Sequence, residues 1–250
     1  KYGGSGLSIR AASVILEEIH RSGGNGAACH AQMYIMGSLL KYGSDILKEK
    51  YLFDIAKGNL RLQAFGVTEP TSGTDTLSIQ TKAKKKGNKY IINGQKVWTS
   101  RAEYSDLIML LVKTNQEAKD SKNSLSLFLI DMRQYIGKEI IIKPIRTMVN
   151  HSTTEIFFDN LEVDQSCIIG EEGQGFKYIL NGLNAERLLI ASECIGDAKY
   201  FIDKSVEYGS QREVFGRPIG KNQGIQFPVA KAYSRTFAAE LTLIEGCNLF

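Results

Sequence analysis

The chain has 250 residues, of which 43% are hydrophobic and 23% are charged. This composition is typical of a globular protein with a substantial core and excludes a disordered chain. The net charge of +4 is spread over 31 basic and 27 acidic residues, so it lacks the concentrated patch that nucleic-acid binding requires. No apolar run is long enough to cross a bilayer and we recognise no signal peptide, so we expect no membrane span.

The first sixty residues are expected to be mainly helical. From Ile9 to Ile19 and from Gln32 to Ala56, apolar residues recur at three- and four-residue spacings. Gly43-Ser44 interrupts the second stretch with turn residues. Ser44 or Asp45 is therefore expected to cap the helix that follows.

The period changes between about Leu62 and Val163. Turn clusters separate the runs in this region, and both residues 86–89 and Asn93-Gly94 are hairpin signals. Repeated short strands without intervening helices favour an antiparallel sandwich or barrel. The expected strands are β-branched and aromatic runs at Tyr90–Ile92, Leu107–Val112, Leu125–Ile130, Ile140–Ile142 and Ile156–Phe158.

The helical period returns after the glycine-rich segment 170–175 and persists to about Tyr208. A second helical stretch begins near Gln223, after Pro218. The sequence therefore predicts an α+β fold with a helical part (residues 1–61), a central β domain (62–165) and a helical bundle (166–250). Lys1 is not a methionine and Phe250 ends a helical pattern without a stop signal, so we expect a fragment of a longer chain.

The most distinctive segment runs from Gly66 to Ser78 and contains Thr68-Glu69-Pro70. Its hydroxyls, glycine and free backbone N–H groups suit a polar planar ligand, and Pro70 and Gly73 provide the bends that aim these groups. A purely structural turn is the alternative interpretation.

A second segment, residues 94–100, carries the only tryptophan. Alternate residues of a strand share a face, so Trp98 and Ser100 are expected to approach one ligand together, as an aromatic plate and a hydroxyl. The alternative is that Trp98 belongs to the core.

Thiols, histidines and lysines indicate no further site. The three histidines lack metal-ligand spacing, so we predict no metal centre, and scattered thiols suit a reducing compartment. The basic run at residues 82–86 is interpreted as a solvated hairpin tip, with a polyanion site as the alternative. The cysteines form no CxxC pair and are Cys29, Cys167, Cys194 and Cys247.

The Thr-Glu-Pro segment followed by a Lys-x-Trp segment resembles the acyl-CoA dehydrogenase family, and the resemblance covers essentially the whole chain, with part of the N-terminal domain and the last C-terminal helices absent. It implies FAD as the cofactor. Seven residues are then expected to face the flavin: Phe65, Val67, Thr68, Gly73, Thr74, Trp98 and Ser100. A third segment resembles the one that reaches the FAD of a neighbouring subunit, through Arg212, Val214, Phe215 and Gln223.

The chemistry that the resemblance implies needs a base that removes an α proton. In many members this base is a glutamate in a later segment that this chain does not contain, but in isovaleryl- and long-chain-type enzymes it matches Glu186. Glu186 shares a helical stripe with Leu183 and Ile190, and burial there would raise its pKa toward the range of a general base. The alternative is an ion pair of Glu186 with Arg187 or a lysine, with the base beyond Phe250.

By the same resemblance, Thr74, Asn184 and Arg187 bind an acyl-CoA substrate. The implied reaction is α,β-dehydrogenation to a trans-2-enoyl-CoA, with electrons passed to an electron-transfer flavoprotein. An oxidase, a flavin monooxygenase and a non-catalytic flavin- or CoA-binding protein are the alternatives. The family implies a homotetramer or homodimer, located in the cytoplasm if bacterial or the mitochondrial matrix if eukaryotic, and the acyl chain is left open.

Overall fold

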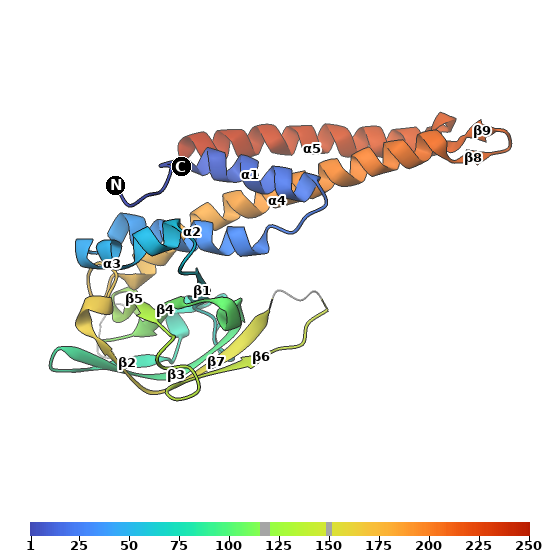
Figure 1. The fold of residues 1–250 in the computed structure, drawn as a ribbon. Coiled ribbons are helices and arrows are strands. Elements are labelled where there is room, and N and C mark those ends of the chain that lie inside the picture. Colours follow the sequence, from blue (N-terminus) through green and yellow to red (C-terminus); the bar gives the residue numbers. More distant parts are fainter. Residues whose placement is uncertain (116–120, 149–151) are drawn as a thin grey trace. The chain divides into compact units, whose positions relative to one another are not determined.

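The computed structural model describes residues 1–115, 121–148 and 152–250 (Figure 1). These residues form two compact units. The first combines Lys1–Ser5 with Ala31–Leu183, and the second combines Gly6–His30 with Asn184–Phe250. The boundaries of the three domains expected from the sequence stay a prediction.

Helices α2 (Ala27–Tyr42) and α3 (Asp45–Ala56) provide most of the helical part of the first unit. The break between them is confirmed at Gly43, where an added Cβ would lie 2.6 Å from the Leu39 carbonyl oxygen. Ser44 is the N-cap of α3, as expected, because its side chain accepts a hydrogen bond from Leu47 N at 3.3 Å.

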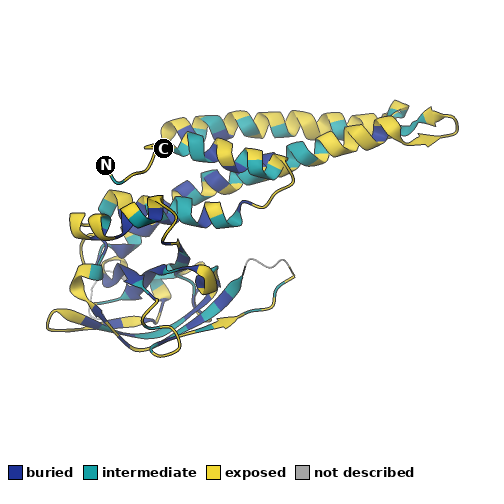
Figure 2. Cartoon of the chain, in the orientation of Figure 1, coloured by how far each residue is buried: buried dark blue, intermediate teal, exposed yellow. Residues whose placement is uncertain are grey.

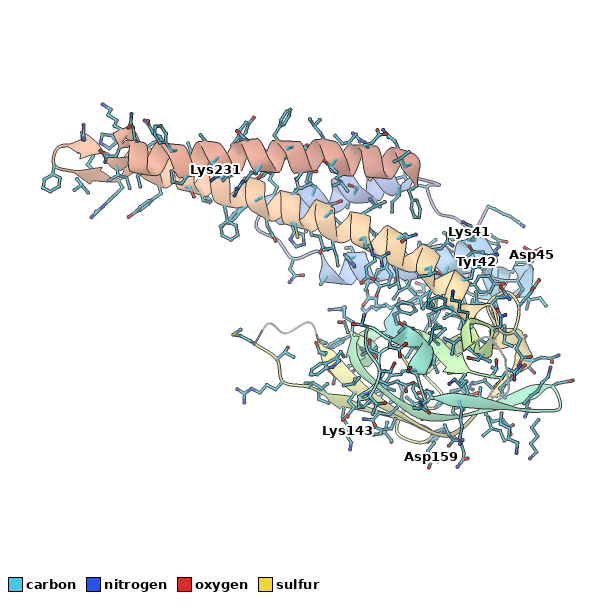
Figure 3. All side chains as sticks on the ribbon, turned by 180° about the vertical axis from the view of Figure 1, so that it is seen from behind. Lys41, Tyr42, Asp45, Lys143, Asp159 and Lys231 are labelled. Carbon is cyan, nitrogen blue, oxygen red and sulfur yellow. The ribbon has the colours of Figure 1, made fainter. Side chains whose placement is uncertain are left out.

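The end of α2 is joined to the first turns of α4 (Gly175–Gln211) by polar and aromatic contacts. Asn181 Nδ2 donates to the Tyr42 hydroxyl at 2.7 Å, and Lys41 Nζ donates to Asn181 Oδ1 at 2.8 Å. The Tyr42 ring stacks on Tyr178 with centroids 4.2 Å apart. Figure 3 shows Lys41 and Tyr42 near Asp45, where α3 begins. These contacts fix the helices that cover the sheet.

The seven-stranded sheet has the order β1-β4-β2-β3-β7-β6, with β5 paired to β4. All five expected strands are confirmed, but the sheet is mixed instead of strictly antiparallel, because β1 runs parallel to β4. The strands are β1 (Leu62–Gly66), β2 (Lys82–Lys86), β3 (Lys89–Ser100), β4 (Leu107–Lys113), β5 (Leu125–Asp131), β6 (Ile140–Pro144) and β7 (Thr153–Asp164). Short 3-10 helices lie at Thr76–Ser78, Ala102–Tyr104, Ser121–Ser124 and Gln165–Cys167.

One of the two hairpin signals is wrong. The β2–β3 turn closes where Lys86 pairs with Lys89, but Asn93-Gly94 lies inside β3 and not at a turn. Gly94 has a φ of +150° beside a register shift, and its Cα faces Thr81 so closely that an added Cβ would lie 2.5 Å from Thr81 Oγ1. Asn-Gly favours a tight turn in many proteins, but in this strand Asn93-Gly94 forms a bulge and allows a close approach of two backbones.

The sheet separates two hydrophobic cores, which appear in dark blue in Figure 2. Leu107, Met109 and Leu111 of β4 face the core that includes α2 and α3, whereas Ile108 and Leu110 face the second core. Both faces of β4 are covered, which explains why its sequence is continuously apolar instead of alternating. Each fully buried leucine of this kind contributes roughly 1.5–3 kcal/mol to folding.

The second unit contains α1 (Ile9–Arg21), the later turns of α4 and α5 (Gln223–Leu249). Gly196 lets α1 and α4 approach, since an added Cβ would lie 2.3 Å from the Glu17 carbonyl oxygen. A short hairpin of β8 (Glu213–Val214) and β9 (Arg217–Pro218) and a 3-10 helix (Ile219–Lys221) connect α4 to α5. No helix in the described part of the chain is long and apolar enough to cross a membrane.

Candidate active site

The Thr-Glu-Pro segment is a closed loop that follows β1. Glu69 N donates to Ser72 O at 2.9 Å, and Ser72 N donates back to Glu69 O at 3.1 Å. The Ser72 hydroxyl donates to the Asp75 carbonyl. These bonds turn the backbone so that Gly73 and Thr74 are exposed, and an added Cβ on Gly73 would meet nothing within 4 Å. The loop is therefore both a structured turn and an accessible surface, so the two interpretations of its sequence are compatible.

The strand that carries Trp98 is irregular at this residue. The register between β3 and β7 shifts between Lys96 and Thr99, and Trp98 has a φ of 61°, which is rare for a bulky residue. Its side chain is 60% exposed, so the interpretation of Trp98 as a core residue is wrong. Ser100, two residues later, is also exposed. Backbone strain that leaves an aromatic plate on the surface is typical of a binding site.

Hydrogen bonds hold the loop and the strand side by side. Val97 N donates to Thr68 O at 2.9 Å, and Lys96 Nζ donates to Val67 O at 2.9 Å. The structure thus brings together the two segments that the sequence separates by about thirty residues. An exposed indole beside hydroxyl-bearing and open backbone positions fits a planar polar ligand.

Phe65, Val67 and Thr68 are half-buried, whereas the other four expected ligand-facing residues of this unit are exposed. The side chains of Phe65 and Val67 pack against the core of the first unit. The Phe65 ring also meets Tyr34 edge-on, with centroids 5.8 Å apart. Their packing positions the backbone that leads into the loop.

The third expected segment belongs to the second unit, whereas the loop and Trp98 belong to the first. Arg212, Val214 and Phe215 are exposed around the β8–β9 hairpin, and Gln223 opens α5. Phe215 is 101% exposed and has a φ of 53°, so its ring has no neighbour within the described chain. Such a ring is available to a ligand or to another protein surface.

Glu186 is half-buried on α4, together with the two residues expected to bind substrate. Burial raises the pKa of its carboxyl above the usual value, and the charges of His30 and Arg187 offset part of this effect. Arg187 Nη1 donates to Asn184 Oδ1 at 2.5 Å, so the guanidinium group is bound to the neighbouring amide. A carboxylate whose pKa is raised by burial is a stronger base than an exposed carboxylate.

Comparison with known proteins identifies the fold. Three models of one family match almost the full chain: the acyl-CoA dehydrogenase N-terminal domain over residues 1–59, the middle domain over 64–161 and the C-terminal domain over 173–248. The chain belongs to the acyl-CoA dehydrogenase family. The resemblance inferred from the Thr-Glu-Pro and Lys-x-Trp segments is confirmed.

Curated relatives within the acyl-CoA dehydrogenase family are about one third identical. Cyclohex-1-ene-1-carbonyl-CoA dehydrogenase of Syntrophus aciditrophicus is 33% identical over 100% of this chain and 60% of its own length. A 3-(aryl)acrylate reductase of Clostridium sporogenes is 35% identical over 96% of this chain and 64% of its own length. The chain therefore spans less than two thirds of these relatives.

Solved structures match the fold over nearly the whole length of this chain. A glutaryl-coenzyme A dehydrogenase in complex with glutaryl-CoA has a TM-score of 0.89 and 30% identity, over 98% of this chain and 62% of the other. A chain described with the electron transferring flavoprotein of Acidaminococcus fermentans has a TM-score of 0.91 and 30% identity, over 99% of this chain and 65% of the other. The expected helix–sheet–helix order is therefore confirmed.

Sequence reasoning missed a partly buried polar cluster in this acyl-CoA dehydrogenase fold. His30 Nδ1 lies 3.0 Å from Glu193 Oε1, and His20 Nδ1 lies 3.0 Å from Asp197 Oδ1. The available signal was the spacing of Glu186 and Glu193, seven residues apart on one helix face. Among the residues with described positions, no group of three potential ligands is arranged to hold a metal ion.

Proposed function

We propose that the protein is an FAD-dependent dehydrogenase that oxidises an acyl-CoA between its α and β carbons to a trans-2-enoyl-CoA. Family membership supports FAD as the cofactor. The observation that carries the proposal is the direct hydrogen bonding of the loop to β3, which places Thr68 beside Val97, the neighbour of the exposed Trp98. Gly73 and Thr74 of the same loop are exposed as well. FAD, when bound, supplies the acceptor for the hydride that leaves the β carbon.

The removal of the α proton is assigned to Glu186. Its carboxyl group is half-buried, and the resulting rise in pKa makes the carboxylate a stronger base than an exposed glutamate. Loss of one proton to Glu186 and of one hydride from the β carbon together remove two hydrogens and leave a carbon–carbon double bond. The thioester carbonyl of the substrate acidifies the α proton that Glu186 removes.

Substrate binding is assigned to Asn184 and Arg187 on α4 and to Thr74 in the loop. Arg187 and Asn184 are exposed and hydrogen-bonded to each other, which presents a cationic and an amide group together. A guanidinium group is suited to the phosphates and carbonyls of a CoA ester. The electron acceptor is assigned as an electron-transfer flavoprotein, and the assembly as a homodimer or homotetramer.

The test is anaerobic titration of the purified holoprotein with a panel of straight, branched and cyclic acyl-CoA esters. We expect loss of the flavin absorbance and a product lighter by two hydrogens for at least one ester. In air, little hydrogen peroxide is expected compared with the reduction of an added electron-transfer flavoprotein or dye, whereas stoichiometric peroxide would indicate an oxidase. A flavin that no ester reduces would contradict the proposed dehydrogenation.

A further inference from the structure

An ion pair is buried directly beneath the Thr-Glu-Pro loop. Lys96 Nζ lies 2.8 Å from Glu69 Oε1, and the exposed fractions of the two side chains are 0% and 4%. Both residues belong to the first unit, and both lie on the segments that the proposed function assigns to FAD. Neither residue is expected to touch the flavin itself, since both side chains point into the protein.

Burial makes this pair costly to maintain. Removal from water lowers the pKa of the Lys96 ammonium group to about 8, and the Glu69 carboxylate offsets part of that loss. For Glu69, burial alone would raise the pKa, but Lys96 and the hydrogen-bond donors around the carboxylate outweigh it, so the net direction is downward. A buried pair of this kind is often replaceable by apolar residues without loss of stability, so stability alone does not explain it.

The pair controls the orientation of three successive loop residues. Lys96 Nζ also donates to Val67 O at 2.9 Å, and the neighbouring Val97 N donates to Thr68 O at 2.9 Å. Together with the bond to Glu69, these contacts tie each residue from 67 to 69 to residues 96–97. The carbonyl groups of Val67 and Thr68 both face β3, and this fixes the orientation of their peptide planes.

Glu69 extends the same network to the next part of the loop. Its carboxylate accepts hydrogen bonds from Gln80 N at 2.5 Å and from Thr81 N at 2.9 Å. Thr81 Oγ1 then donates to Gln95 O at 3.2 Å, next to Lys96 on β3. The loop is therefore attached to the strand at both of its ends, with Glu69 at the centre.

The surrounding backbone leaves space for the lysine. An added Cβ on Gly66 would lie 2.8 Å from Leu110 Cδ1 and 3.4 Å from Lys96 Cγ. A larger residue at position 66 would therefore clash with Leu110, while its Cβ would touch the Lys96 side chain at an ordinary contact distance. Two residues beyond Lys96, the strand adopts the left-handed conformation that exposes Trp98.

We propose that Lys96 and Glu69 are positioning residues that hold the Thr-Glu-Pro loop against β3, so that the loop and Trp98 present one preformed surface to FAD. The inference rests on the proposed function for the identity of the ligand. It goes beyond that function because it assigns a role to two residues that are hidden from the ligand. A preformed surface binds more tightly because less conformational freedom is lost on binding.

The test uses Lys96→Met, Glu69→Gln and the double variant, each prepared without flavin. Either single change breaks the pair and is expected to lower the midpoint of thermal unfolding. The double change also removes the surviving buried charge, so most of that midpoint should return. The affinity for FAD should nevertheless stay about tenfold or more below wild type in the double variant, a loss equivalent to about 1.4 kcal/mol.

Hydrogen exchange of the flavin-free proteins measures the loop itself. We expect faster exchange of the amides in residues 67–75 in the double variant, with the central strands unchanged. The matched control is Lys89→Met, which removes an exposed ion pair with Glu162 from the same strand and should leave exchange and FAD affinity unchanged.

The outcomes separate the positioning role from the choice of ligand. A double variant with wild-type loop exchange and wild-type FAD affinity would overturn the positioning role. If the double variant does not fold, Glu69→Gln is measured in the same way, and wild-type exchange and affinity in that variant overturn the role equally. Wild-type protein that binds no FAD would instead refute the proposed function, while faster loop exchange in the variants would still support the positioning role.

Discussion

Glu193 Oε1 lies 3.0 Å from His30 Nδ1, and Glu193 lies on the same face of α4 as Glu186, which is seven residues earlier in the chain. His30 is 8% exposed, and its charge lowers the pKa of Glu186 against the larger effect of burial. The proposed base therefore has a charge partner that is itself held in place by a second carboxylate. Arg187 is the other cation that acts on Glu186, and His20 and Asp197 complete the neighbouring polar cluster.

The first prediction concerns the pH dependence of flavin reduction. The proposed base, Glu186, can accept the α proton only when it is ionised, so the rate should fall at low pH as this carboxyl group becomes protonated. His30→Gln removes a charge that favours the ionised form, so the acid limb of the pH profile should move to higher pH. The measurement is the stopped-flow rate of flavin reduction between about pH 4 and 9, a range that extends upward from the ordinary pKa of a glutamate carboxyl group.

His20→Gln is the matched control for this shift. His20 bonds Asp197 and Gly26 and lies 3.7 Å from Glu193 Oε1, but its charge is not among those that act on Glu186. The acid limb of the pH profile of His20→Gln should coincide with that of wild type. A His30→Gln profile that also coincides with wild type would show that His30 does not influence the base.

The second prediction is that Glu186→Gln abolishes substrate-dependent flavin reduction and leaves FAD bound. The amide has nearly the same shape as the carboxyl group but cannot accept the α proton. Loss of a single catalytic base typically lowers a rate by about 10²–10⁴-fold. Retained reduction at the wild-type rate would assign the base to another residue.

The same substitution should raise stability at neutral pH. Because the folded-state pKa of Glu186 lies above the unfolded value, this group destabilises the folded state once it is ionised. The stability that Glu186 contributes is present below its unfolded pKa and is lost as pH rises through its folded pKa. The midpoint of thermal unfolding of Glu186→Gln should therefore exceed wild type at pH 7 and approach it at pH 4.

The helices and most strands of this fold follow closely from the periodicity of the sequence. An amphipathic helix buries every third or fourth residue, and a strand with one covered face buries every second residue. The break at Gly43 and the cap at Ser44 were predictable, since both depend on neighbouring residues alone. The site was only partly predictable. A lysine in a strand is normally exposed, so the sequence did not predict that Lys96 is buried. Its burial depends on Glu69, which is 27 residues away.

Contacts between distant segments explain the other differences. The His30–Glu193 pair joins residues 163 positions apart, and no local pattern encodes it. Asn93-Gly94 favours a hairpin locally, but pairing of β3 with both β2 and β7 continues the strand through it. Trp98 likewise has high strand propensity, and its left-handed conformation is imposed by the bulge between Lys96 and Thr99.

The third prediction separates stability from FAD binding at Trp98. Glycine adopts a positive φ without the strain that a bulky residue incurs, and the lost indole is 60% exposed. Trp98→Gly should therefore keep the flavin-free protein as stable as wild type or stabilise it by about 1 kcal/mol, the lower end of the strain stored at such positions. The affinity for FAD should fall, as measured by fluorescence titration.

Tyr104→Ala is the matched control, because Tyr104 is an aromatic residue of the same unit that is 51% exposed and lies outside the loop and strand site. Its FAD affinity should equal that of wild type. If Trp98→Gly also binds FAD with wild-type affinity, the indole is not part of the flavin surface.

The last prediction concerns the close approach of Gly94 and Thr81. An alanine Cβ at position 94 would lie 2.5 Å from Thr81 Oγ1 and 2.6 Å from Thr81 Cα, so the backbone must move. Overpacking of this kind costs about 1–3 kcal/mol. Because Thr81 N donates to Glu69, the movement should also loosen the loop and weaken FAD binding.

The control is Gly73→Ala, where an added Cβ meets nothing within 4 Å, and this variant should unfold at the same urea concentration as wild type. Equal unfolding midpoints for Gly94→Ala and wild type would contradict the tight contact.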